Sequence, residues 1–204
     1  MGKAVVVIDY GMGNLFSVAS ALRYLGCDPL ISDDPQVVKA ATHVILPGVG
    51  SFRLAMERLR ATGLDDAVRN TAQSGHHLLG ICLGMQLLGT SSTEDGNTTG
   101  LGIISNTVQL FDESAGIKIP HVGFNEINPT TTTGLFEDLP AKPHFYFVHS
   151  YRMSVGALDC AYATCTYGEE FLAAFDMGNV CGAQFHPEKS QANGLQLMKN
   201  FLSR

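Results

Sequence analysis

The chain has 204 residues, a size that suits one α/β domain, with 45% hydrophobic and 16% charged residues. This composition excludes a disordered chain, and the formal net charge of −6 argues against binding along a nucleic-acid backbone, which needs clustered Lys and Arg. No apolar run approaches the length of a membrane span. We therefore expect a single domain over 1–204, with no nucleic-acid or membrane partner.

The five cysteines are an odd number and include no C-x-x-C pair. A disulfide framework is therefore not expected, and a reducing cytoplasm is the compartment that fits best. By default, a cysteine in such a protein is a small buried apolar residue. A catalytic role for any one of them needs a specific motif.

The first half of the chain alternates short apolar runs with helical patterns. The β-branched run over 4–8 predicts a strand that is buried on both faces of a sheet. Apolar residues at helical spacing over 15–25 predict the next helix, and Gly26 supplies its stop. The same reasoning predicts strands over 43–46 and 78–81, and helices over 34–41, 51–59, 65–73 and 85–88. Strands that alternate with helices indicate a parallel sheet with right-handed crossovers.

The second half of the chain changes character. Residues 91–100 are polar and predict a loop, and apolar residues at helical spacing over 194–204 predict a closing helix. Between them, the spacing of strand candidates indicates antiparallel additions to the sheet rather than a second domain: 145–149, 159–166, 171–175 and 180–185. The expected fold class is α/β, an open and mostly parallel sheet flanked by helices, with antiparallel strands added in the second half.

The segment Gly80-Ile81-Cys82-Leu83-Gly84 lies between a predicted strand and a predicted helix. It matches the nucleophile elbow with Cys in place of Ser, a sharp turn that presents the side chain at the carboxyl edge of the sheet. The start of a helix supplies free N–H groups and a positive dipole end, which both stabilise a thiolate. We expect Cys82 to be a nucleophile and the Leu83 N–H to face a developing oxyanion.

A candidate base occurs in Phe185-His186-Pro187-Glu188, directly after an apolar strand. Pro187 favours extended geometry for the preceding residue, and residues two apart in an extended segment face the same side. Glu188 can therefore orient the His186 imidazole and stabilise its protonated form, as in a catalytic triad. A surface turn after a strand is the alternative for this motif alone. Five other histidines precede or begin apolar segments, where a structural role is the default: His43, His76, His77, His121 and His144.

The segment Pro47-Gly48-Val49-Gly50 ends another predicted strand. The carboxyl ends of parallel strands meet at one edge of a sheet, so this loop is expected on the same edge as Cys82. Its glycines let backbone N–H groups approach a ligand, and Val49 or Gly50 could therefore supply a second oxyanion donor. An ordinary strand-to-helix turn is the alternative.

Together, these three motifs resemble those of the class I, or triad, glutamine amidotransferases. The resemblance narrows to the glutaminase subunits of imidazole glycerol phosphate synthases through segments that span nearly the whole chain: 9–15, 47–52, 120–125 and 146–151. One departure is Phe124, where this subfamily usually has Trp, although an aromatic ring is kept.

The resemblance implies that Cys82 attacks the carboxamide of glutamine to form a γ-glutamyl thioester. His186 would transfer the protons and Glu188 would hold His186. Gln86 would contact the substrate, and the backbone around three consecutive residues would bind its α-amino and α-carboxylate ends: His149, Ser150 and Tyr151. No cofactor and no metal are implied.

The resemblance also implies a partner. Ammonia would pass to a (β/α)8-barrel synthase subunit in a heterodimer, which makes imidazole glycerol phosphate and an aminoimidazole carboxamide ribotide in histidine biosynthesis. By analogy, the loop over 47–50 would complete the oxyanion hole only in the activated complex. The candidates for the partner-facing surface are Asn14, Phe124 and Lys189.

Three other functions stay open on the residues alone. A stand-alone γ-glutamyl hydrolase or peptidase could use the same triad without a partner. Gly11 and Gly13 after the first strand suit a nucleotide-binding module, but Phe16 stands where the third glycine of the dinucleotide fingerprint belongs. A metal site is disfavoured because no His/Cys pair has ligand spacing.

Overall fold

The computed structural model describes residues 4–112, 116–156 and 158–204. The strands of its central sheet are β1 (Val5–Ile8), β2 (Leu30–Ser32), β3 (His43–Leu46), β4 (His77–Ile81), β9 (Asn128–Pro129), β12 (Ala161–Tyr167), β13 (Glu169–Met177) and β14 (Val180–Ala183). Their order is β2-β1-β3-β4-β14-β13-β12-β9. From β2 to β14 neighbouring strands run parallel, whereas β13, β12 and β9 are antiparallel to their neighbours. The predicted α/β fold class is confirmed.

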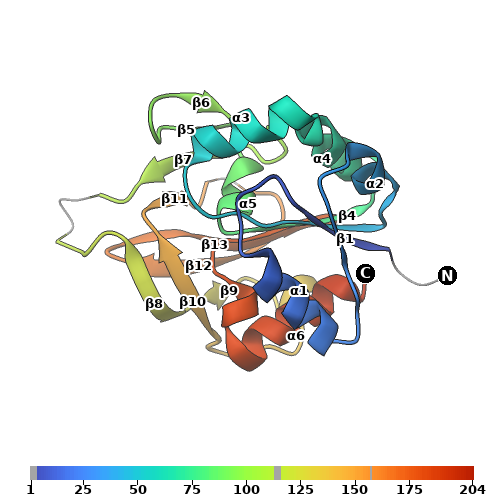
Figure 1. Cartoon of the computed structure of the whole chain (residues 1–204). Helices are drawn as coiled ribbons and strands as arrows, with labels where there is room; N and C mark the ends of the chain where they lie inside the picture. The colour runs from blue at the N-terminus through green and yellow to red at the C-terminus, as the bar shows by residue number, and fades with distance from the viewer. Residues whose placement is uncertain (1–3, 113–115, 157) are drawn as a thin grey trace.

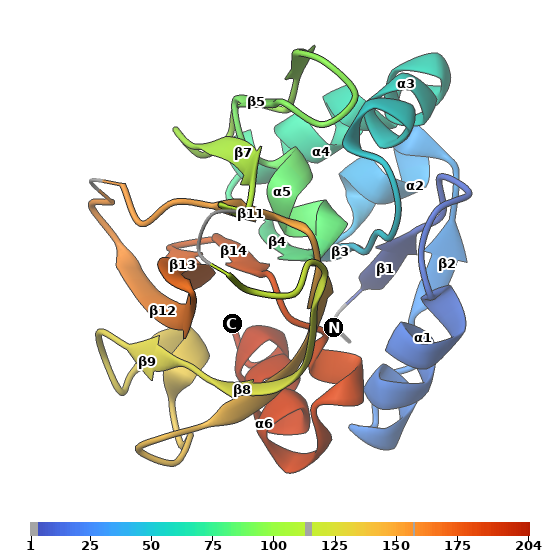
Figure 2. The same ribbon diagram turned by 90° about the vertical axis from the view of Figure 1, so that its left-hand side faces the viewer.

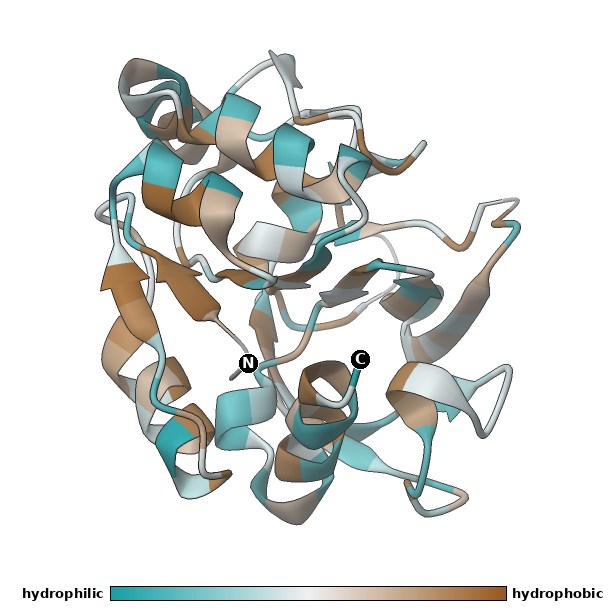
Figure 3. Cartoon of the chain, turned by 90° about the vertical axis from the view of Figure 1, so that its right-hand side faces the viewer, coloured by the Kyte–Doolittle hydropathy of each residue, from teal (hydrophilic) through white to brown (hydrophobic). Residues whose placement is uncertain are grey.

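Helices cover both faces of this sheet (Figure 1). On one face lie α1 (Leu15–Tyr24) and α6 (Gln191–Leu202), and on the other lie α2 (Pro35–Ala40), α3 (Phe52–Thr62), α4 (Leu64–Gln73) and α5 (Leu83–Leu87). The side chains of β1 alternate between the two cores: Val5 and Val7 pack with α1 and α6, while Val6 and Ile8 pack with α2 to α5. All four are buried, as the β-branched run predicts. Hydrophobic residues accordingly fill β1 and β3, whereas the helices carry both hydrophobic and hydrophilic positions (Figure 3).

Two smaller sheets accompany the central one (Figure 2). An antiparallel pair consists of β8 (His121–Glu126) and β10 (His144–His149), and a four-stranded sheet consists of β11 (Tyr151–Met153), β7 (Thr107–Leu110), β5 (Ser91–Ser92) and β6 (Thr98–Thr99). Strand β10 runs almost directly into β11, with only Ser150 between them. The segment predicted to bind the ends of the substrate is therefore the junction between these two sheets.

Most predicted elements are present with shifted ends. Helix α5 begins directly after Cys82 rather than at 85, α3 continues to Thr62, and α6 begins at Gln191. The predicted loop over 91–100 is wrong in part, because it contains β5 and β6. Strands β2, β7, β8, β9 and β11 were not predicted, since most are too short to show a periodic pattern.

The prediction that all strands of the second half are antiparallel additions is wrong for β14. This strand pairs in parallel with β4, from Val180 opposite Leu78 to Ala183 opposite Ile81. It is wrong in another way for β10, which pairs with β8 outside the central sheet. An apolar run shows burial but not strand direction. The parallel arrangement brings the residues that follow β14 to the same edge of the sheet as Cys82.

Two glycines allow the turn after β4 to pack closely. A Cβ atom at Gly84 would overlap the carbonyl oxygen of Leu46 at the end of β3, and a Cβ at Gly80 would lie 2.7 Å from the backbone of Met85. Both obstacles are backbone atoms, which cannot rotate away as a side chain can. The glycines at 80 and 84 therefore let β3, β4 and α5 meet.

We predict that Gly84→Ala lowers the free energy of unfolding by about 3 kcal/mol, because the added methyl forces apart two packed backbones. The matched control is Gly156→Ala, where a Cβ would meet no heavy atom within 4 Å. Urea unfolding followed by circular dichroism measures both variants. Equal stability of the two would contradict the packing that we describe for the turn.

Candidate active site

Cys82 stands at the turn between β4 and α5 with φ 53° and ψ −112°, a conformation that side-chain-bearing residues rarely adopt. Its N–H donates to the carbonyl of Ala183 on β14 at 2.7 Å, and its carbonyl accepts from the N–H of Gln86 at 3.2 Å. This is the strained elbow that the sequence predicts. The N–H of Leu83 lies in the first turn of α5, where N–H groups have no intrahelical partner.

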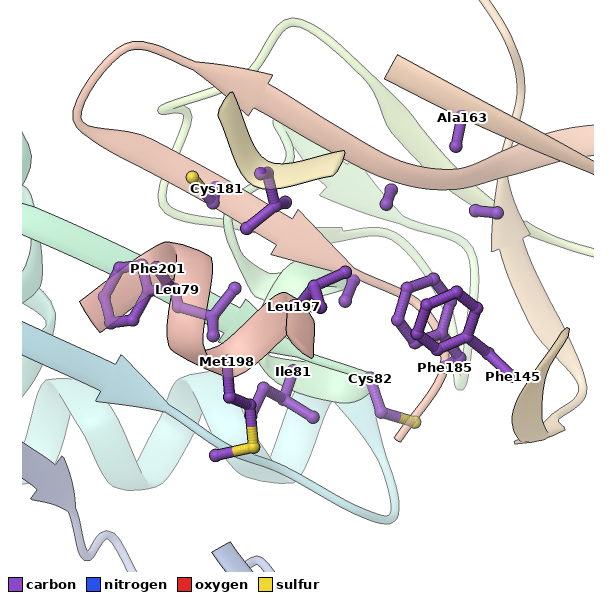
Figure 4. Close-up of a cluster of buried hydrophobic side chains, with 14 of the residues drawn as sticks. Leu79, Ile81, Cys82, Phe145, Ala163, Cys181, Phe185, Leu197, Met198 and Phe201 are labelled. Atoms are coloured by element: carbon purple, nitrogen blue, oxygen red, sulfur yellow. The ribbon is translucent and has the colours of Figure 1, made fainter. Parts of the chain in front are cut away.

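The side chain of Cys82 is 5% exposed and belongs to a hydrophobic core cluster (Figure 4). The same cluster contains the stacked rings of Phe145 and Phe185, whose centroids are 3.9 Å apart. Two weak polar contacts reach the sulfur: Sγ donates to the carbonyl of Val148 at 3.9 Å, and Gln184 Nε2 donates to Sγ at 3.8 Å. In such an apolar setting, charges near the sulfur interact more strongly than in water.

His186 and Glu188 form a buried pair beside this sulfur. His186 Nδ1 lies 2.8 Å from Glu188 Oε1, and the side chains are 3% and 1% exposed. His186 itself is extended, as expected, but the extended segment ends there, because Pro187–Lys189 form the 3-10 turn η3. The carboxylate therefore reaches the ring from a tight turn, not along an extended strand as predicted.

The surroundings of His186 keep its ring protonated. Burial alone lowers the pKa of the imidazole, but its interactions with Cys82 and Glu188 outweigh burial and raise the pKa to about 10. His186 Nε2 is buried and makes no hydrogen bond with the described residues, so it is available to exchange a proton with the nearby sulfur. A proton on the ring beside Cys82 is the state in which a base has activated a thiol nucleophile.

A cavity of about 480 Å³ opens at Cys82. Its wall includes every residue predicted for the oxyanion hole or for substrate binding: Val49, Gly50, Leu83, Gln86, His149, Ser150 and Tyr151. His186 is not in the wall. Segments distant in sequence thus meet around one thiol, while the individual role of each wall residue stays a prediction.

A family model described as "Glutamine amidotransferase class-I" matches residues 6–204. The chain belongs to this family. Proteins named "Imidazole glycerol phosphate synthase subunit HisH" are similar to this amidotransferase along nearly its whole length. The one from Moorella thermoacetica is 45% identical over 98% of this chain and 94% of its own. The one from Yersinia pestis is 46% identical over 97% of this chain and 98% of its own.

Solved structures share the fold of this amidotransferase. One described as "Crystal structure of glutamine amidotransferase" has a TM-score of 0.74 at 20% identity and covers 98% of both chains. Another, "Structure of PurLQS from Thermotoga maritima", has a TM-score of 0.74 at 17% identity and covers 100% of this chain and 99% of that one. Identities this low show a common architecture only.

The described part of this amidotransferase has neither a candidate metal site nor a candidate membrane helix. Within 4–112, 116–156 and 158–204, no group of three or more His, Cys, Asp and Glu is placed to hold a metal ion. In the same ranges, no helix is both long and apolar enough to cross a bilayer. All five cysteines are free thiols.

Glu94 lines the cavity of this amidotransferase, although no sequence motif points to it. Its Oε2 accepts a hydrogen bond from the N–H of Phe52, the first residue of α3, at 2.8 Å. Burial raises the pKa of this carboxyl, the Phe52 N–H lowers it, and neighbouring Asp95 raises it again. Only its position identifies Glu94, because nothing in the sequence separates it from other acidic residues in a polar segment.

Gln184 was also missed, although it is fully buried between the cavity wall and the sulfur. Gln86 Nε2 donates to Gln184 Oε1 at 2.9 Å and to the carbonyl of Tyr151 at 2.8 Å. Gln184 Nε2 in turn donates to Cys82 Sγ at 3.8 Å. Gln184 thus connects the predicted substrate residue Gln86 to the nucleophile.

The three residues predicted to face a partner are not in the cavity wall. Phe124 is 49% exposed, and its ring centroid lies 5.6 Å from that of Tyr146. Lys189 Nζ lies 5.8 Å from the centroid of the same Tyr146 ring, so Phe124 and Lys189 share one surface. Asn14 has a structural contact instead, since its Oδ1 accepts from the N–H of Ser17 at 3.2 Å and caps α1.

We predict that iodoacetamide at about pH 6 modifies Cys82 at least about tenfold faster than any other cysteine. Cys82 has His186 beside it as a base that can take its proton, whereas burial raises the pKa of the remaining thiols: Cys27, Cys160, Cys165 and Cys181. Timed quenching and mass spectrometry of peptides measure the rates. His186→Asn should lose the selectivity, and the exposed His144→Asn should keep it. Selective labelling that survives in His186→Asn would disprove the pairing.

Proposed function

We propose that this amidotransferase hydrolyses glutamine to glutamate and ammonia through Cys82, His186 and Glu188. The observation that supports this most is the buried His186–Glu188 pair, 2.8 Å apart, beside a cysteine held in a strained turn. The Cys82 thiolate adds to the carboxamide carbon, and His186 gives its proton to the departing ammonia. His186 then takes a proton from the water that hydrolyses the γ-glutamyl thioester, which releases glutamate and frees the thiol.

Backbone N–H groups would stabilise the negative oxygen that forms in both steps. The proposed donors are Leu83, at the positive end of α5, and Val49 or Gly50 in the facing loop. That loop is anchored at its first residue, because the Tyr10 hydroxyl donates to the Pro47 carbonyl at 2.9 Å. Removal of one such donor typically lowers the rate by about 100- to 1,000-fold.

The ends of glutamine would bind to other residues of the cavity wall. Residues 149–151, Gln86 and Glu94 line the cavity, and Glu94 lies beside the loop that carries Val49 and Gly50, since its Oε2 accepts from the Phe52 N–H. A carboxylate suits the α-ammonium group of an amino acid, and backbone N–H groups suit its α-carboxylate. These groups would select free glutamine over a glutamine residue within a peptide chain.

We further propose that the chain folds as one domain and works in the reducing cytoplasm as the smaller part of a heterodimer. Its partner would be a (β/α)8-barrel subunit that uses the ammonia to make imidazole glycerol phosphate and aminoimidazole carboxamide ribotide. Support comes from the relatives named as subunits of that synthase, which match nearly the full chain. Exposed Asn14, Phe124 and Lys189 would face the partner.

The test is a glutaminase assay with the purified barrel subunit and its nucleotide ligand, and without them. Glutamate release should be fast only in the ligand-bound complex, because the loop over 47–50 would complete the oxyanion hole there. Cys82→Ala should abolish release, and the control Cys27→Ala, at a position that does not line the cavity, should not. Release that persists in Cys82→Ala rules out the nucleophile, and full activity of the isolated chain rules out dependence on the partner.

A further inference from the structure

Two histidines outside the triad lie side by side next to the cavity. His121 on β8 and His149 on β10 are opposite each other in the antiparallel register, and both are buried. His121 Nδ1 and His149 Nε2 are 3.1 Å apart. The His121 ring also stacks on Phe147 and Tyr167, with centroid distances of 4.8 and 4.0 Å.

The neighbours of each ring nitrogen determine where the hydrogens are. His149 Nδ1 lies 2.8 Å from the carbonyl oxygen of Tyr151, which can only accept, so this nitrogen carries a hydrogen. Burial lowers the pKa of His149 to about 3 and that of His121 to about 4, so both rings are neutral. The Nε2 of His149 is therefore an acceptor, and His121 Nδ1 must donate to it. This leaves His121 Nε2 to accept from the side-chain amide of Asn125 at 3.5 Å.

The Tyr151 carbonyl is held from two sides. His149 Nδ1 and Gln86 Nε2 both donate to it, each at 2.8 Å. On the Gln86 side, the hydrogen bonds continue through Gln184 to the Cys82 sulfur. On the His149 side, they continue to His121. One carbonyl of the cavity wall is thus linked both to the nucleophile and to the histidine pair.

We propose that His121 is a positioning residue for glutamine: its hydrogen bond fixes the His149 tautomer that holds the Tyr151 carbonyl, and thereby the 149–151 backbone. This inference rests on the proposed function, because it explains how that site keeps its substrate wall in place. Without the donor at 121, His149 can carry its hydrogen on Nε2. A lone pair on Nδ1 then faces the carbonyl oxygen, and repulsion displaces the backbone that lines the cavity.

Two substitutions separate this role from simple packing. His121→Phe keeps a ring to stack on Phe147 and Tyr167 but has no hydrogen to donate. His121→Asn keeps a donor near the position of Nδ1 but loses the ring. We expect His121→Phe to raise KM for glutamine about tenfold, with a smaller change in kcat and a nearly unchanged Tm. His121→Asn should have a lower Tm but a KM close to that of the wild type.

The kinetics are measured on the complex with the barrel subunit, and nitrogen-15 NMR of the imidazoles reports the His149 tautomer in the wild type and His121→Phe. The hydrogen should sit on Nδ1 in the wild type and shift to Nε2 in the variant. An unchanged tautomer, or a KM that rises more in the Asn variant than in the Phe variant, overturns the inference. If the wild-type complex does not turn over glutamine, the proposed function itself is refuted. If the wild-type complex is active but KM for glutamine rises more in His121→Asn than in His121→Phe, only the proposed role of His121 is refuted.

Discussion

The backbone of Cys82 is held at a positive φ of 53°, and much of the surrounding structure serves to keep it there. A residue in such a conformation is strained by about 1–3 kcal/mol, which neighbouring contacts must offset. Here the N–H of Cys82 is tied to β14, and glycines on both sides let β3 and α5 close over the turn. The result is a thiol at the carboxyl edge of the sheet with a helix N-terminus beside it.

The parallel pairing of β14 with β4 determines which groups reach that thiol. Gln184 and His186 follow β14 directly and are two residues apart, so both can approach the sulfur from the same side. His186 brings the Glu188 carboxylate and, in the proposed mechanism, transfers the protons. Gln184 brings the hydrogen bonds to Gln86 and, through it, to the Tyr151 carbonyl. The end of one strand thus leads both to the proposed base and to the connection with the proposed substrate wall.

Local patterns were enough to predict the elbow and the base. The backbone around Cys82 is constrained by Gly80 and Gly84, and the structure has the predicted strand–turn–helix there. Pro187 constrains the backbone between His186 and Glu188, and these two side chains form the predicted pair. The direction of β14 could not be predicted, because buried strands look alike in either direction. Glu94, Gln184 and the His121–His149 contact depend on how distant segments meet. The last of these follows only from the register of β8 against β10.

The central claim is that Cys82 forms a covalent bond to the γ-carbonyl of glutamine. The most direct measurement is acid quenching of the complex during glutamine turnover, since acid slows the hydrolysis of thioesters, followed by mass spectrometry of the peptide that contains Cys82. This account predicts one glutamyl group on that peptide, removed by neutral hydroxylamine. Glutamate release with the glutamyl group on a different residue, or without any adduct at Cys82, would contradict it.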